Sequence, residues 1–135
     1  MAVFSLKNAS ILINAIDLSN KSNSVTVNYE IDSIEVTAFG SGGHTFAGGL
    51  QNISVDITLH QDLAASSVEA TIFPLVGTTT TLAIKNDSAA TSATNPLYTI
   101  SNAFLASHTP VAGAIGDLAS TSLTFTGGTI VKTTV

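Results

Sequence analysis

Two stretches of the chain, SVTVNYEI at residues 24–31 and NISVDITLH at residues 52–60, decide the fold that we expect. Apolar and polar residues alternate along both, and the apolar set consists of Val25, Val27, Tyr29 and Ile31 in the first and Ile53, Val55, Ile57 and Leu59 in the second. A period of two over eight or nine residues predicts antiparallel strands with one buried face and one polar face.

Further segments rich in Thr, Val, Ile and aromatic residues extend this pattern on both sides. We expect strands at Ser10–Leu18, Ser33–Phe39, Thr79–Lys85, Leu97–Ala106, Thr121–Thr126 and Thr129–Val135. One segment, residues 62–73, has apolar residues at helical spacing between a candidate N-cap, Asp62, and Pro74. The sequence therefore predicts a mainly β fold of one domain over residues 1–135: an antiparallel β-sandwich or partly rolled barrel with one short flanking α-helix.

The composition indicates a protein that covers its own surface by self-association. Hydrophobic residues make up 44% of the chain and charged residues only 10%, with four lysines, no arginine and a formal charge of −5. So few charges leave a lone monomer poorly solvated, and strand edges without lysine or proline are templates for pairing with another chain. The same charge balance argues against tight nucleic-acid binding, because nothing neutralises a run of phosphates.

No pattern of catalytic, cofactor-binding or metal-binding residues is present in the sequence. His44, His60 and His108 are far apart in the chain, have no second ligand at metal spacing, and are expected at the surface. Glu30, Asp32 and Glu35 surround an expected turn and are predicted to be solvated charges. We therefore expect no enzyme activity, no cofactor and no metal.

Four segments together resemble the tail tube (major tail) proteins of long-tailed, non-contractile phages of actinobacteria, which are siphovirus-type phages. These segments are SVTVNYEIDSIEVTAFGSGG (24–43), AGGLQNISVDITLHQDLAASSVEATIFPLVGTTTTLAIK (47–85), ATNPLYTISNAFLASHTPVAG (93–113) and GDLASTSLTFTGG (116–128). The resemblance covers most of the chain and consists of an order of strands, turns and glycine loops; it includes no catalytic signature.

The resemblance implies a homo-oligomer of hexameric rings stacked into the tail tube of a virion. DNA would pass through this tube without specific binding, and other tail proteins would bind at its ends. The protein would be made in the host cytoplasm, with no role for a membrane. A lumen-facing surface is implied for Thr26, Asn28, Glu30, Glu35, Ser54, Asp56 and Thr58. An inter-ring loop is implied within Phe39–Leu50, at Phe39, Gly40, Gly42, Gly43, His44, Phe46, Gly48 and Gly49.

Two alternatives remain open from the sequence. The first is a capsid decoration or cement protein, which would form discrete small oligomers on a head lattice. The second belongs to a different class, a small ligand- or carbohydrate-binding β-sandwich in which the glycine loop and His44 frame a site. The absence of tryptophan and the presence of only two tyrosines make a platform for sugar stacking weak.

Overall fold

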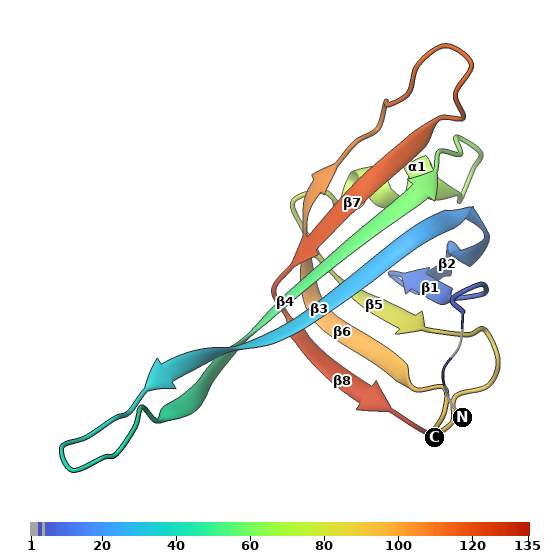
Figure 1. The fold of residues 1–135 in the computed structure, drawn as a ribbon. Helices are drawn as coiled ribbons and strands as arrows, with labels where there is room; N and C mark the ends of the chain where they lie inside the picture. The colour runs from blue at the N-terminus through green and yellow to red at the C-terminus, as the bar shows by residue number, and fades with distance from the viewer. Residues whose placement is uncertain (1–2, 4) are drawn as a thin grey trace.

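The computed structural model describes Val3 and residues 5–135, and this part of the chain is built mainly of antiparallel strands. The strands are β1 (Ser10–Ile13), β2 (Ile16–Asp17), β3 (Ser22–Glu35), β4 (Phe46–His60), β5 (Thr79–Lys85), β6 (Leu97–His108), β7 (Ser120–Thr126) and β8 (Thr129–Thr133). They form one sheet in the order β2-β1-β5-β6-β7-β4-β3, and β8 also pairs with β6. The sheet curls without closing (Figure 1), so the partly rolled form is the one adopted.

The sheet divides along one side of β6. The first half of β6 pairs with β8 and the second half pairs with β7, which continues to β4 and β3. Gly127 and Gly128 make the connection between β7 and β8, both with positive φ. A Cβ on Gly128 would lie 2.2 Å from the carbonyl oxygen of Ser101, so only glycine fits beside β6 at this point.

The inner side of the curl holds the hydrophobic core. Its fully buried side chains include Ile57 of β4, Leu82 of β5, Leu105 of β6 and Phe125 of β7, and β3 adds the partly buried Val25 and Val27. The five-residue helix α1 (Val68–Ile72) adds Val68 and Ile72 to the same cluster. No helix among the described residues is long and apolar enough to cross a membrane.

The predicted helix over residues 62–73 is wrong in its extent. Helical residues begin only at Val68, after the N-cap Ser67, and a 3₁₀ turn, η2 (Phe73–Leu75), continues the chain through Pro74. The Asp62 carboxylate accepts a hydrogen bond from the backbone N–H of Ala64, which makes a turn instead of a helix cap. Ser66 has φ +60°, a left-handed conformation that an α-helix does not allow.

The strands expected at Ser24–Ile31 and Ser33–Phe39 are joined in one continuous strand, β3, which ends at Glu35, so residues 36–39 lie outside it. The acidic turn expected between the two strands does not exist. A register shift between Ile31 and Ser33 marks a β-bulge, and the opposite strand passes this point with two glycines. A Cβ on Gly49 would lie 3.2 Å from the Cβ and the carbonyl oxygen of Asp32. Glycine at this position lets the backbones approach, and the strand bends without turning back.

Two further expectations need correction. The expected strand Ser10–Leu18 is a short hairpin of β1 and β2, because Asn14 and Ala15 both have positive φ and reverse the chain. The expected loop Phe39–Leu50 is shorter than predicted, since its residues from Phe46 onward belong to β4 and pair with β3. The connection between β3 and β4 consists of residues 36–45.

Candidate functional site

The outer face of β3, β4 and β7 forms a continuous polar surface, which we call the polar face. The strand register aligns Thr26 with Asp56 and Thr124, and it aligns Asn28 with Ser54 and Thr126. The polar face comprises Thr26, Asn28 and Glu30 of β3, Ser54, Asp56 and Thr58 of β4, and Ser122, Thr124 and Thr126 of β7. Alternate residues of the same strands point into the core, because successive side chains of a strand point to opposite faces.

Cross-strand hydrogen bonds join the side chains of the polar face to one another. Asn28 Nδ2 donates to Ser54 Oγ over 3.3 Å, and Thr124 Oγ1 donates to Asp56 Oδ1 over 3.2 Å. The charged groups on this face are the carboxylates of Glu30 and Asp56, among many hydroxyls. The face can therefore hold water and repel anions, and it offers no positive charge to a phosphate.

The structure brings together six of the seven residues expected on a lumen face. Glu35 is separated from them, because it lies beyond the β-bulge, where its carboxylate contacts His44 Nδ1 and accepts a 3.0 Å hydrogen bond from Thr37 Oγ1. Sequence reasoning missed the contribution of β7. The alternation of Ser122, Thr124 and Thr126 with Leu123 and Phe125 is the signal that could have revealed it.

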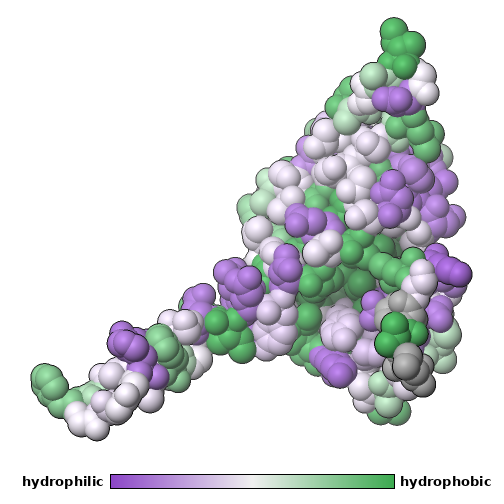
Figure 2. All heavy atoms as spheres, in the orientation of Figure 1, coloured by the Kyte–Doolittle hydropathy of each residue, from purple (hydrophilic) through white to green (hydrophobic). Residues whose placement is uncertain are grey.

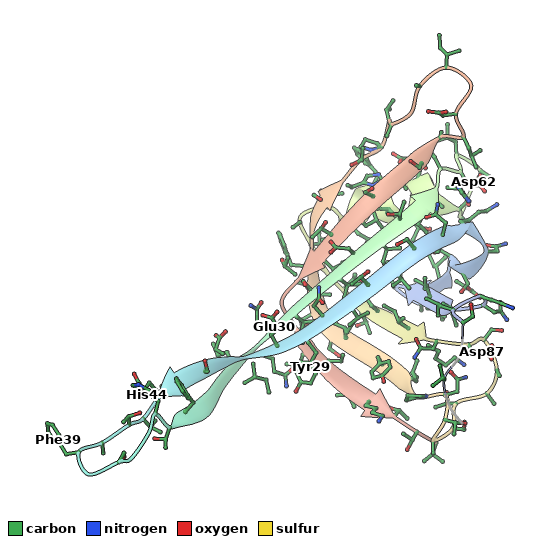
Figure 3. The ribbon with its side chains drawn as sticks, in the orientation of Figure 1. Tyr29, Glu30, Phe39, His44, Asp62 and Asp87 are labelled. Atoms are coloured by element: carbon green, nitrogen blue, oxygen red, sulfur yellow. The ribbon has the colours of Figure 1, made fainter. Side chains whose placement is uncertain are left out.

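Beyond the bulge, β3 and β4 leave the body as a two-stranded projection, the arm, which comprises residues 31–50. Figure 1 shows the arm extending away from the curled sheet, and Figure 3 places Phe39 at its tip, pointing away from the body, with His44 further back. Large apolar side chains of the arm are exposed: Ile31, Ile34, Val36, Phe39, Phe46 and Leu50. The arm buries almost nothing within its own chain, so a partner is needed to cover it.

The residues expected in an inter-ring loop all lie on the arm, but not all of them in a loop. Phe39, Gly40, Gly42, Gly43 and His44 belong to the connection between the strands. Phe46, Gly48 and Gly49 belong to β4, where Phe46 pairs with Glu35 and Gly48 pairs with Ser33.

His108 is buried, contrary to the expectation that all three histidines lie at the surface. Its side chain is 2% exposed, Nε2 lies 3.2 Å from Glu69 Oε2, and Nδ1 lies 3.0 Å from Thr121 Oγ1. A hydroxyl, an imidazole and a carboxylate in series resemble a nucleophilic triad. Thr121 is 1% exposed, however, so no substrate reaches its hydroxyl, and the contacts join α1 to β6 and β7.

An open hollow of about 720 Å³ lies between the N-terminal segment and the chain around residues 86–95. Lys7, Asn8, Asp87 and Asn95 are among the residues that line it. None of its lining residues comes from the arm, so the glycine loop and His44 do not frame this hollow. No group of three or more potential metal ligands occurs among the described residues.

The opening of the curled sheet leaves strand edges unpaired. β3 pairs only with β4, and β8 pairs only with β6, so each has one free edge in the described chain. Figure 2 shows apolar side chains at the surface in the middle of this view, beside the polar residues of the strands. A free edge next to apolar surface is a site where another chain can add its own strand.

Comparison with solved structures gives similar folds over nearly the whole chain. A chain of the extended sheath-tube complex of an extracellular contractile injection system, PVC, aligns with a TM-score of 0.73 at 15% identity, over 98% of this chain and 93% of that one. A chain of the native gene transfer agent (GTA) virion also aligns with a TM-score of 0.73, at 14% identity, over 97% of this chain and 99% of that one.

A more distant similarity is to Hcp1 from Flavobacterium johnsoniae, with a TM-score of 0.54 at 11% identity, over 93% of this chain and 98% of that one. No protein-family model matches the sequence, and no curated protein is significantly similar to it in sequence. At these identities the similarities establish a shared fold.

Proposed function

We propose that this chain is a tail tube protein, a non-enzymatic component of a phage or phage-like particle. Copies close side by side into hexameric rings, and the rings stack into a tube through which DNA passes. The proposal is supported by the shared fold with chains from a sheath-tube complex and from a gene transfer agent virion. The sequence resemblance extends it to long-tailed, non-contractile phages of actinobacteria, with other tail proteins bound at the tube ends.

The observation that carries this proposal is that the polar face ends at a free strand edge. β3 contributes Thr26, Asn28 and Glu30 to the polar face, and its outer edge has no partner in the described chain. A neighbouring copy that pairs with this edge would continue the polar face from one protomer to the next. A head-to-tail contact of this kind closes into a ring when its rotation divides the circle.

The chemistry of the polar face suits the lining of a DNA channel. Hydroxyl groups keep the wall wet, and repetition around a ring turns Glu30 and Asp56 into belts of negative charge that repel phosphates. The arm, with Phe39 at its tip, reaches away from the body and is assigned to contacts between successive rings. In this arrangement the protein resides in the virion after its synthesis in the host cytoplasm.

Electron microscopy of the purified protein tests the proposal directly. We expect long hollow polymers in negative stain at high protein concentration. Discrete small oligomers, such as trimers, would favour a capsid decoration protein instead. A chain that stays monomeric at every concentration, and is found in no assembled particle, would overturn the proposal.

The lumen assignment has its own test. Replacement of the two carboxylates of the polar face by lysine, Glu30→Lys with Asp56→Lys, is expected to preserve the fold but to slow the ejection of DNA through assembled tails. Asp117→Lys, which changes an exposed carboxylate away from the polar face, is the matched control. Equal ejection rates in assembled tails of both variants would place the polar face outside the channel.

A further inference from the structure

One row of side chains crosses five strands on the outer side of the sheet. The strand register aligns Asn28 of β3 with Ser54 of β4, and it aligns Ser54 with Thr126 of β7. The row continues from Thr126 to Phe104 of β6, and from Phe104 to Thr79 of β5. Phe104 and Thr79 are exposed, and the residues on either side of Phe104 in β6 are buried. The polar face therefore extends over β6 to the start of β5, with Phe104 as an exposed aromatic residue in it.

The backbone groups of Thr79 point away from β6. The Leu105 N–H donates to the Thr78 carbonyl over 3.1 Å, and the Leu105 carbonyl accepts from the Gly77 N–H over 3.0 Å, so Leu105 directs its backbone groups to β5. Because these directions alternate along an antiparallel strand, Phe104 directs its groups to β7, and its pair with Thr79 has no backbone hydrogen bonds. The N–H and C=O of Thr79 therefore face the outer edge of β5.

This outer edge of β5 is open at Thr79. The Asn14 N–H donates to the Thr81 carbonyl over 3.0 Å, so Thr81, and by alternation Thr79, face the side on which β1 lies. β1 itself pairs with β5 only over residues 82–85. No strand of the described chain therefore covers the N–H and C=O of Thr79.

The same alternation shows which groups β3 presents at its free edge. The Ile53 carbonyl accepts a 2.9 Å hydrogen bond from the glycine that follows β7, so Ile53 faces β7 and the next residue, Ser54, faces β3. The pair of Ser54 with Asn28 is therefore hydrogen-bonded, and the backbone groups of Asn28 point to β4. Those of Val27 and Tyr29, on either side of Asn28, point outward from the free edge.

The strand directions allow the edges of β3 and β5 to meet in one way. Neighbouring strands are antiparallel throughout the series β5, β6, β7, β4 and β3, so the first and the fifth run in the same direction. Copies around a ring are related by rotation about the ring axis, which keeps the direction of every strand relative to that axis. β3 of one copy is therefore parallel to β5 of the next copy.

A parallel joint also agrees with the directions of the backbone groups. In a parallel ladder, a residue that faces the partner strand lies opposite a residue that faces away, and it bonds to the two neighbours of that residue. Thr79 faces outward and Asn28 faces inward, so both side chains can lie on a continuous polar face. An antiparallel joint would place Thr79 opposite Val27 or Tyr29, whose side chains lie on the core side, and the polar face would be interrupted.

The other strand edges do not extend this row. β8 lies in the other branch of the divided sheet, and β2 lies beyond β1. The last part of β6 is flanked by its own chain, since Gly77 bonds to Leu105 and the Phe73 ring lies against the His108 ring at 6.5 Å between centroids. Among the described strands, the start of β5 is therefore the edge that a neighbouring β3 can extend.

We propose that β3 of one copy pairs in parallel with the start of β5 of the next copy, at Thr79. This inference rests on the proposed function, because it names the second edge of the joint that closes the ring. The Thr79 N–H donates to a carbonyl of the neighbouring β3, and the Thr79 carbonyl accepts from an N–H two residues further along that strand. Each copy then contributes five strands to one continuous hydroxylated wall.

Proline at the edge of β5 tests the joint. Thr79→Pro removes an N–H that the described chain does not use, and an edge position tolerates proline. We expect the critical concentration for assembly to rise about tenfold, because the joint loses a hydrogen bond and leaves a carbonyl of the neighbour without its donor. Circular dichroism and the thermal midpoint of the monomer check that the variant folds.

Lys132→Pro in β8 is the matched control. The Ile130 N–H donates to the Gln51 side chain, so Ile130, and by alternation Lys132, face away from β6. This proline also occupies an open strand edge, and we expect it to leave assembly unchanged. A folded Thr79→Pro variant that assembles like the wild type, or an equal loss of assembly in Lys132→Pro, would overturn the proposed joint.

Disulfide cross-linking tests the direction of the joint, because the chain contains no cysteine. Thr79→Cys is combined with Thr26→Cys, Asn28→Cys or Glu30→Cys, since the stagger of a closed barrel sets which residue lies opposite. One combination is expected to link up to six chains on a non-reducing gel. Within one copy, Thr79 and Asn28 are four strand spacings apart, about 19 Å along the sheet, which is too far for a disulfide.

The control for cross-linking is Thr79→Cys combined with Tyr29→Cys. The Tyr29 side chain lies on the core side of β3, so this combination is expected to stay unlinked. Links through position 29 in place of the three others, or no links at all in rings that have assembled, would contradict a parallel joint with a continuous polar face.

The outcomes also separate the two proposals. If the wild-type chain forms no polymer, the proposed function fails. If the wild-type chain polymerises, while Thr79→Pro polymerises equally well and cysteine at position 79 forms no links, the joint at β5 is wrong and the tube function stands.

Discussion

The body and the arm contain two halves of the same pair of strands, β3 and β4, and they hold their structure by different means. In the body, β4 buries Ile53, Val55, Ile57 and Leu59 against the core. In the arm, the same strands expose most of their apolar residues, and each half has a different side-chain contact between an acidic and a basic residue. Lys21 Nζ lies 2.9 Å from Asp62 Oδ2 at the body end, whereas Glu35 contacts His44 at the arm end.

This difference shows that one continuous β-ladder can be stable at one end and dependent on a partner at the other. The strand pairing of the ladder continues on both sides of the bulge. Burial of apolar side chains is confined to the body end of the ladder. The hydrophobic effect that this burial supplies is the dominant favourable contribution to folding. The body therefore has the burial that stabilises a fold, while the arm has almost none within its own chain.

The largest expected effect comes from opening a cavity in the body. Phe125 is completely buried, so Phe125→Ala should lower the free energy of unfolding by about 3–5 kcal/mol through lost burial and an unfilled cavity. Urea denaturation followed by circular dichroism measures the change. A loss below about 1 kcal/mol would mean that the core is less tightly packed around β7 than the structure indicates.

The next effect concerns the division of the sheet at β6. Gly128 has φ +88°, and a Cβ there would meet the Ser101 carbonyl. Gly128→Ala should therefore cost about 2–4 kcal/mol of stability, from left-handed strain together with displacement of backbone. Gly43→Ala is the matched control in the arm, because its Cβ would meet nothing within 4 Å and its φ is not positive. An equal loss of stability in both variants would contradict the conclusion that the connection beside β6 requires glycine at position 128.

A smaller effect is expected at the body end of the two strands. The pKa of the Asp62 carboxyl is lowered from 3.8 to about 2, mainly by the hydrogen bond from the Ala64 N–H and then by Lys21 and Ser67. Because the folded pKa is the lower one, this carboxylate stabilises the fold above pH 3.8, and the contribution is lost as the pH falls toward 2.

An NMR titration of the Asp62 carboxyl in the Lys21→Ala variant measures this contribution. We expect the pKa of Asp62 to rise toward its ordinary value while remaining below it, since the Ala64 hydrogen bond stays. An unchanged pKa would mean that Lys21 does not act on Asp62 in solution.

The smallest effect on stability is expected at the arm tip. Phe39 is fully exposed, so Phe39→Ala should change the free energy of unfolding of the monomer by less than about 0.5 kcal/mol. The same variant should weaken assembly, which sedimentation velocity over a concentration series measures. A loss of monomer stability comparable to that of Phe125→Ala would show that the arm folds back on the body.

Much of the fold could be predicted from the sequence because its signals are local. The alternation at residues 24–31 and 52–60 predicts strands with one buried face, and the strand at Thr79–Lys85 has the predicted bounds. The helix was predicted too long because the turn at Asp62 and the left-handed Ser66 are not visible in apolar spacing. The acidic turn was predicted wrongly because β3 continues through Asp32, and the bulge opposite Asp32 lies in β4, which cannot be seen when only one strand is read.

The candidate site could also be predicted only in part. The side of each strand that carries Thr26, Asn28, Ser54 and Asp56 follows from the alternation alone. The sequence could not place β7 beside β4, and it grouped Glu35 with the polar face although the bulge separates it. Strand neighbours depend on contacts between distant segments, and a local pattern contains no information about them.

The sequence by itself determined that this chain forms antiparallel strands with an apolar and a hydroxylated side and that it has few charges. Only the tertiary structure decided that β6 divides the sheet, that β3 keeps a free edge, and that β3 and β4 extend beyond the body as the arm. The physical reason is that side-chain alternation is set residue by residue along a strand. Edges and bulges arise only after distant strands have paired.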